Sequence, residues 1–158
     1  MALEELTARL AEEMGARLDG ASPDGSVELV LNDDMMIEVH PDPSGSGFLF
    51  SGTVCDLPTE NREAVFGELL HANLLGQGTQ GARLGIDPAL DEIVLCRSFS
   101  DENMPYDVFA KDLGRFAEVL DFWRARHRHG KLGAGDLDEE ALDDEASDDE
   151  SDAAAIKV

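Results

Sequence analysis

The order of elements between Glu60 and Trp123 constrains the fold of this chain more than any other feature of its sequence. The segment begins with an amphipathic helix ending near Leu75 and continues through a glycine-rich turn into two short strands, at 82–87 and 92–99. A second amphipathic helix follows. Its apolar side chains recur every three or four residues and so share one helical face: Tyr106, Phe109, Leu113, Phe116, Leu120 and Trp123. The segment therefore predicts a small α+β domain.

The first half of the chain predicts one helix and an antiparallel meander. Leucine and methionine recur at near-helical spacing over residues 2–18. Apolar residues then alternate with polar ones in three runs, at 27–31, 35–40 and 48–55, and a period of two is typical of strands. Turn-forming residues separate the runs. The predicted order is α-βββ-α-ββ-α, an antiparallel sheet with the helices packed on one face.

The distribution of charge divides the chain and limits its partners. The formal net charge is −23, of which residues 131–158 carry −9 and residues 1–130 carry −14. The last segment lacks aromatic residues and cannot bury enough apolar surface to offset the entropy of ordering, so we expect a domain at 1–130 and a disordered acidic tail at 131–158. Because an acidic field repels phosphates, nucleic acids and anionic membranes are not expected as partners.

Neither a secretory signal nor a membrane span is expected. The N-terminus lacks a basic region followed by an apolar one, and no apolar run approaches the roughly 20 residues that cross a bilayer. We therefore expect a cytoplasmic protein. Cys55 and Cys96 fall in strand-like runs and could form a disulfide if their strands are neighbours, but reduced, buried thiols are the favoured interpretation.

Two motifs suggest chemistry, but their contexts favour structural roles. The stretch Gly76-Gln77-Gly78-Thr79-Gln80-Gly81 matches the dinucleotide-binding pattern G-x-G-x-x-G, yet it follows a helix and precedes a strand, the reverse of the required order. A helix end and chain reversal is the favoured interpretation. His127 and His129 are flanked by arginines, which favours a helix-end cationic cluster over a metal site. We expect no catalytic residues, cofactor or metal.

The predicted sheet leaves one face without helices. Several strand residues on the alternate face are apolar or nearly so: Val30, Met36, Leu49, Cys55, Val94 and Cys96. We expect some of these residues to be covered by a partner, either a second copy or another chain. A sheet with open edges can also accept an extended peptide as an added strand.

The chain resembles the class I type III secretion chaperones, the Tir-chaperone family, over about residues 1–127. The resemblance rests on Leu69-Leu70-His71-Ala72-Asn73-Leu74-Leu75, followed by Leu84-Gly85-Ile86-Asp87 and Ile93-Val94-Leu95. Members of that family typically have a leucine-rich helix ending in an Asn-Leu-like step, a small-residue turn and a Leu-Gly-Leu-Asp-like strand. The aromatic closing helix with a Trp near its end also fits, whereas the acidic tail is outside the usual pattern.

This resemblance implies a non-enzymatic, ATP-independent homodimer that binds an extended, N-proximal segment of a secreted effector and keeps it soluble. A regulatory or sensory interaction domain on a similar fold is the alternative. The implied dimer surface comprises Phe66, Leu69, Leu70, Leu74, Leu84 and Ile86. The implied effector surface comprises Leu6, Leu10, Leu29, Leu31, Ile37, Val39, Phe48 and Phe50. Periodicity assigns these residues to faces, and some of them can face the core instead.

Overall fold

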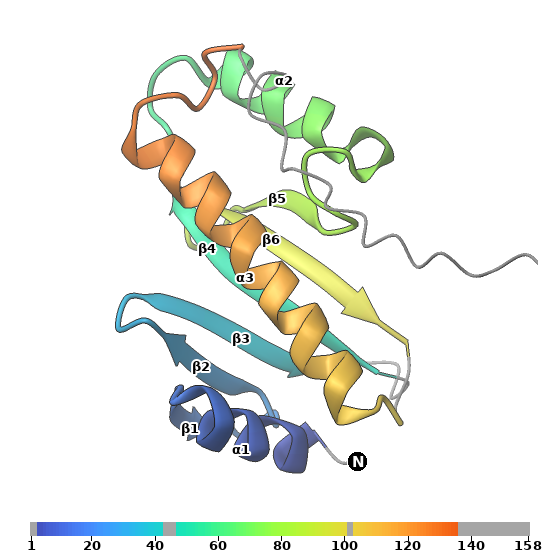
Figure 1. The fold of residues 1–158 in the computed structure, drawn as a ribbon. Helices are drawn as coiled ribbons and strands as arrows, with labels where there is room; N and C mark the ends of the chain where they lie inside the picture. Colours follow the sequence, from blue (N-terminus) through green and yellow to red (C-terminus); the bar gives the residue numbers. More distant parts are fainter. Residues whose placement is uncertain (1–2, 43–46, 101–102, 136–158) are drawn as a thin grey trace, which may run out of the picture.

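The computed structural model describes residues 3–42, 47–100 and 103–135 (Figure 1). Three α-helices and one short 3-10 helix accompany six strands within these ranges. In chain order they are α1 (Leu3–Met14), β1 (Arg17–Ala21), β2 (Val27–Leu31), β3 (Met35–Pro41), β4 (Phe48–Asp56), α2 (Arg62–Asn73), η1 (Leu74–Gly76), β5 (Arg83–Asp87), β6 (Glu92–Phe99) and α3 (Tyr106–Arg128).

The strands form one antiparallel sheet in the order β1-β2-β3-β4-β6-β5. Helices α1 and α3 lie over the same face of this sheet, while α2 lies beyond the edge strand β5 (Figure 1). The predicted α+β class and the order α-βββ-α-ββ-α are confirmed, with one short strand added after the first helix. None of the helices in the described part of the chain is long and apolar enough to cross a membrane.

The first helix is shorter than the sequence predicted, and its last predicted turn belongs to a strand. Helix α1 ends at Met14 because Gly15 adopts a left-handed conformation, with φ of 65°, which reverses the chain. The chain then forms β1, in which Leu18 pairs with Leu29 of β2. Helical spacing from Leu3 to Leu18 therefore extended the prediction across a real break at the glycine.

The core lies between the sheet and the α1–α3 layer. Alternate strand residues point into it, and Leu29, Ile37 and Phe50 are fully buried. The predicted stripe of α3 faces the same core, where Phe109 and Phe116 pack against aromatic rings of β4 at centroid distances of 5.4 to 5.6 Å. Sheet and helix periodicities thus meet in one aromatic cluster.

A β-bulge in β4 changes the side on which Cys55 lies. The register with β6 shifts between Thr53 and Cys55, so that Cys55 pairs with the buried Ile93 and points into the core. The prediction that Cys55 lies on the uncovered face is therefore wrong. Cys96 pairs with Ser51 on that uncovered face, so the two sulfurs lie on opposite sides of the sheet, and both thiols are free.

The two thiols are expected to react at different rates. Burial raises the pKa of Cys55 to about 11, with a smaller effect from Asp56, and burial also raises the pKa of Cys96. At pH 8 with a thiol-reactive chromophore, we expect slow labelling of Cys96 and labelling of Cys55 only on unfolding. Cys96→Ser should remove the slow phase and Cys55→Ser should leave it. Rapid labelling of native Cys55 would contradict this assignment.

The stability of the fold also depends on the ionisation of Cys55. Because the folded pKa is raised, the stability contributed by protonated Cys55 is present below pH 9 and lost between about pH 9 and 11.

Folded contacts continue past the predicted domain boundary at residue 130. After α3, the backbone amide of Gly133 donates to Glu68 Oε2 of α2 at 2.7 Å. A Cβ at Gly133 would lie 2.9 Å from Val65 Cγ2, so the chain passes close against α2. The segment 131–135 is thus attached to the domain. Most of the predicted acidic tail, residues 136–158, lies outside the described residues.

Candidate partner-binding surfaces

An apolar patch is exposed where α2, η1 and β5 meet. Leu70, Leu74 and Leu75 expose 71%, 62% and 86% of their surface, and Ile86 exposes 42%. Phe66 lies half-buried beside them on α2. We refer to Phe66, Leu70, Leu74, Leu75 and Ile86 as the α2–β5 patch. A group of exposed apolar side chains at one end of an acidic protein is typical of a protein-interaction surface.

Asn73 attaches the end of α2 to the edge of β5. Its side-chain amide donates to the carbonyl of Leu84 at 2.9 Å and accepts from the amide of Leu84 at 2.8 Å. These two bonds replace a neighbouring strand at this point of the edge. Leu75 follows in a left-handed conformation, with φ of 57°, although its side chain is almost fully exposed. The backbone therefore presents leucine side chains outward at the end of α2.

The residues of the predicted dimer surface divide between the patch and the core. Leu70, Leu74 and Ile86 are exposed, and Phe66 is partly so. Leu69 and Leu84 are only 4% and 6% exposed, so in the single chain they pack beneath the patch. Leu75 was not in the predicted set. Its position directly after the Asn-Leu step is the sequence signal that could have added it.

The sheet face opposite α1 and α3 carries a second set of accessible apolar residues. Met36 is 50% exposed, and four of the predicted alternate-face residues are partly exposed: Val30, Leu49, Val94 and Cys96. Glu38 and His40 of β3 and Ser51 and Thr53 of β4 lie on the same side of the sheet. We call this uncovered side the open face. It combines apolar and acidic groups, which suits a polypeptide partner.

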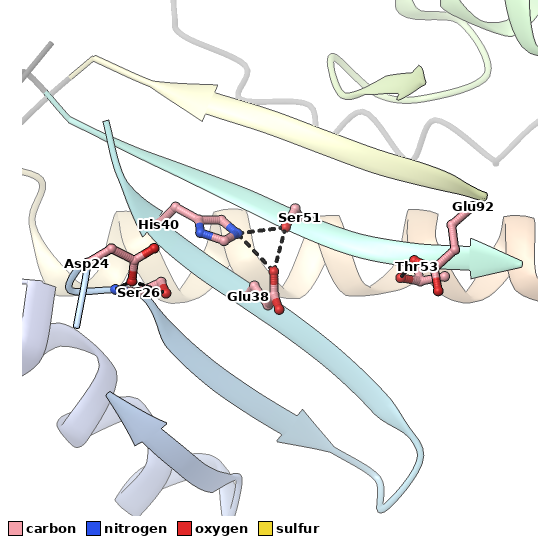
Figure 2. Close-up of polar contacts among 7 residues, drawn as sticks. All are labelled: Asp24, Ser26, Glu38, His40, Ser51, Thr53 and Glu92. Carbon is pink, nitrogen blue, oxygen red and sulfur yellow. Dashed lines mark hydrogen bonds and ion pairs between the residues drawn. The ribbon is translucent and has the colours of Figure 1, made fainter. Parts of the chain in front are cut away.

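Figure 2 shows the polar groups on the open face, including a histidine, a serine and a glutamate in contact. His40 Nε2 lies 3.0 Å from both Ser51 Oγ and Glu38 Oε2. A catalytic triad needs the carboxylate on Nδ1 and the hydroxyl on Nε2, whereas here both contact the same nitrogen. The arrangement therefore orients side chains on the sheet and does not activate Ser51 as a nucleophile.

Asp24 lies near this cluster, in the turn before β2 (Figure 2). The hydroxyl and amide of Ser26 donate to Asp24 Oδ1 at 2.6 and 3.0 Å and lower the pKa of Asp24. Asp24 and His40 also line a hollow together with Asp42 and Leu49. The acidic character of the open face therefore extends to this end of the sheet.

The structure places the eight residues of the predicted effector surface inside the core. None of them is more than 8% exposed in the single chain: Leu6, Leu10, Leu29, Leu31, Ile37, Val39, Phe48 and Phe50. Six of them are strand residues whose alternation correctly indicated one face of the sheet, but α1 and α3 cover that face. The other two, Leu6 and Leu10, belong to α1 and pack onto the sheet from the covering layer. The accessible apolar residues of the same strands are those on the open face, one position along. Side chains in a strand alternate between faces with a period of two, so the residue next to each buried one lies on the open face.

The glycine-rich stretch and the histidine pair occupy the predicted contexts. The glycines run from the last residue of η1, Gly76, to the loop before β5, with Gly76 and Gly81 at φ of 69° and 86°. Gly78 packs against Ala72, and its carbonyl accepts a hydrogen bond from Trp123 Nε1 at 3.0 Å. His127 is exposed near the end of α3, and His129 follows it. No group of three or more His, Cys, Asp or Glu side chains suited to a metal is found among residues 3–42, 47–100 and 103–135.

These features define an α+β protein-interaction domain with an apolar patch at one end of its sheet and an open face. The sequence pattern of the Tir chaperone protein (CesT) family matches residues 6–124, about three quarters of the chain. The chain belongs to this family, and it is a chaperone of the type III secretion class. No curated protein sequence matches it closely enough to count as a relative.

Solved structures with the same fold include members of chaperone–effector complexes. The HopA1-SchA chaperone–effector complex contains a chain that matches with a TM-score of 0.59 at 14% identity, over 77% of this chain and 92% of that one. The ExoU-SpcU complex from the type III secretion system of Pseudomonas aeruginosa matches with a TM-score of 0.53 at 21% identity, over 80% and 93%. YbjN, a putative transcription regulator from E. coli, matches with a TM-score of 0.58 at 15% identity, over 80% and 93%. At these identities the likeness establishes the fold.

Proposed function

We propose that this chain is a non-enzymatic, ATP-independent secretion chaperone that acts in the cytoplasm as a homodimer. It binds an extended, N-proximal segment of a secreted effector and keeps that segment soluble and competent for export. The observation that carries the proposal is the pairing of two accessible apolar surfaces, the α2–β5 patch and the open face, on a domain of this family. One surface suits a second copy and the other suits the effector.

The α2–β5 patch is the surface proposed for the second copy. Its leucines are mostly exposed in the single chain, so they contribute little to the core of a monomer. Exposed apolar groups of this kind are typical of an interface with another chain. Homodimers usually have closed two-fold symmetry, in which the same surface of each copy meets the other. A helix end and a strand that are joined by the Asn73–Leu84 bonds form a preorganised surface of this kind.

Substituting two patch leucines should abolish dimerisation. Leu70→Asp with Leu74→Asp places two carboxylates at the proposed contact, where burial of unpaired charge is strongly unfavourable. We expect the mass measured by light scattering to fall from two chains to one, with the thermal unfolding transition retained. The matched control is Met14→Asp with Val108→Asp, since these residues are 53% and 41% exposed outside the patch. A double patch variant that stays dimeric would exclude this interface.

Effector binding is tested by co-expression and proteolysis. The tagged chain is expressed with each secreted protein encoded near it, and co-purified protein is identified by mass spectrometry. We expect one or a few secreted proteins to be retained through an N-proximal segment that limited proteolysis leaves protected. A chain that retains none of them and is monomeric would exclude the proposed function.

A regulatory domain on the same fold is the second candidate, because YbjN, a putative transcription regulator, has a similar fold. Such a domain would bind a folded partner. The two candidates differ in the state of the bound protein, which hydrogen exchange measures. Slow exchange in a globular partner would favour regulation, whereas a partner with fast exchange outside the protected segment would favour the chaperone.

A further inference from the structure

Strands β3 and β4 part from each other on the open face. Their pairing runs from Pro41↔Phe48 to Glu38↔Ser51 and stops there. Beyond that point residues 35–37 of β3 pair with β2, and residues 52, 53, 55 and 56 of β4 pair with β6. Figure 2 shows the two strands diverging, with α3 crossing behind them. The edges of β3 and β4 that face each other are therefore not joined along this stretch.

Helix α3 holds the two strands apart. At Gly52 an added Cβ would lie 2.5 Å from Leu120 Cδ2, so Leu120 occupies the space that a side chain at residue 52 would need. One turn further along, Arg124 Nη2 donates to the carbonyl of Asp34 at 3.1 Å and lies 3.6 Å from its carboxylate. The β2–β3 turn is thus tied to α3, away from β4. The separation is built into the core packing.

A groove of about 480 Å³ occupies this site and is open to solvent. Its apolar lining comes from both sides of the sheet, since Val54 points toward the core while Met36 and Val94 lie on the open face. Carboxylates surround it: Asp34, Glu38, Asp87 and Glu92. With the guanidinium of Arg124, the lining carries a net charge of −3 when His40 is neutral.

Neighbouring hydroxyl groups hold two of these carboxylates in position. Thr53 Oγ1 donates to Glu92 Oε2 at 3.0 Å, and Ser51 Oγ lies 3.5 Å from Glu38 Oε2 (Figure 2). These contacts orient the carboxylates without neutralising them. A cationic group entering the groove would therefore find negative charge that is already positioned.

We propose that this groove binds an extended, cationic stretch of the effector, in which Lys or Arg alternates with small apolar residues. The inference rests on the proposed function and adds the chemistry of the bound segment. An extended segment entering between β3 and β4 points successive side chains to opposite sides. Apolar residues then contact Val54 on the α3 side, and basic residues reach Glu38 and Glu92 on the open face. The facing strand edges supply backbone groups for strand addition.

Three fluorescein-labelled peptides of 12 residues test the sequence pattern by fluorescence anisotropy on the full chain. One repeats Lys-Val-Arg-Ala, one replaces each basic residue with Glu, and one rearranges the first so that its basic residues share a helical face. We expect the first to bind, with affinity falling several-fold as salt rises from about 50 to 300 mM, because added salt screens exposed ion pairs. The acidic peptide should not bind. Equal or tighter binding of the helically patterned peptide would overturn the extended mode.

Substitutions in the groove test the location. Glu38→Gln with Glu92→Gln should weaken binding of the first peptide about five- to tenfold, as expected for the loss of two partly exposed ion pairs. The matched control, Glu12→Gln with Glu118→Gln, makes the same charge change at exposed helical positions and should stay within about twofold of wild type. If the double glutamine variant loses its thermal transition, Thr53→Lys provides the second test, because Thr53 is exposed and a lysine there repels the peptide.

The groove assignment and the proposed function can be tested independently of each other. A chain that still retains its secreted protein but binds peptide equally well with and without Glu38 and Glu92 would overturn the groove assignment alone. Failure to retain any secreted protein would overturn the proposed function, whatever the peptides do. A fall in the solution mass of Thr53→Lys to a single chain would mean that a second copy occupies the groove, which also overturns this inference.

Discussion

Replacing Arg126 with methionine is expected to lower the free energy of unfolding by about 3–5 kcal/mol, the range found when one member of a buried ion pair is removed. The Arg126 and Glu68 side chains are 2% and 4% exposed, and Arg126 Nη2 lies 2.8 Å from Glu68 Oε1. The guanidinium also donates to the carbonyl of Lys131, while Glu68 accepts from Gly133. One network therefore joins α2, α3 and the segment after α3. Methionine would leave the Glu68 carboxylate buried without its cation.

Equilibrium urea unfolding measures this effect, with two comparisons that separate charge from packing. Arg128→Met removes an exposed arginine that lies 3.4 Å from Asp121, and we expect a loss of at most about 1 kcal/mol. Glu68→Leu with Arg126→Met removes both charges, so a large part of the lost stability should return. Equal losses for Arg126→Met and Arg128→Met would mean that the buried pair contributes no more than a surface contact.

The sequence did not predict this ion pair, and the reason is its distance along the chain. Arg126 was interpreted as part of a cationic helix end, together with His127 and Arg128. Its neighbours on that end are exposed, whereas Arg126 continues the buried stripe three residues after Trp123. The partner, Glu68, lies 58 residues earlier on a helix with little amphipathic contrast. The spacing from Trp123 indicated a buried position, but only the fold supplies the carboxylate that makes burial tolerable.

Strand and helix faces were predictable, but which face is inside was not. Alternation in β2, β3 and β4 grouped Leu29, Ile37 and Phe50 correctly on one side. In the single chain that side is buried under α1 and α3, because the sheet has two apolar faces and only one is covered, so its assignment to a partner stays a prediction. The larger aromatic and aliphatic side chains lie on the covered face. Size was the available signal, since large apolar side chains dominate cores.

Departures from regular geometry account for the remaining differences. Gly15 ends α1 early and allows β1, although the helical period continues through it. The bulge after Thr53 moves Cys55 into the core, against simple alternation. On the α2–β5 patch, the family resemblance implied Leu70 and Leu74 but not Leu75, whose side chain is presented by a left-handed backbone conformation. A periodic pattern cannot register a single residue that breaks the period.

Replacing Trp123 with alanine should lower the free energy of unfolding by about 3–5 kcal/mol, as expected for a large aromatic residue removed from a core. Trp123 is fully buried, and its Nε1 donates to the carbonyl of Gly78, 45 residues away. This bond fixes the glycine-rich turn that carries the chain from α2 to β5. Alanine would remove both the packed ring and the donor, so the turn would lose its link to α3.

Trp123→Phe separates these two contributions. Phenylalanine retains most of the ring but leaves the Gly78 carbonyl without its donor, so we expect a smaller loss of about 1–3 kcal/mol in urea unfolding. Amide hydrogen exchange should accelerate locally at Gly78 and Thr79, whose amides bond to Ala72 and Gly76. The control is Phe122→Leu, at a half-buried neighbour with no bond to the turn, which should leave exchange there unchanged. Unchanged exchange in Trp123→Phe would show that the turn is held by its glycine packing against Ala72 and not by the indole.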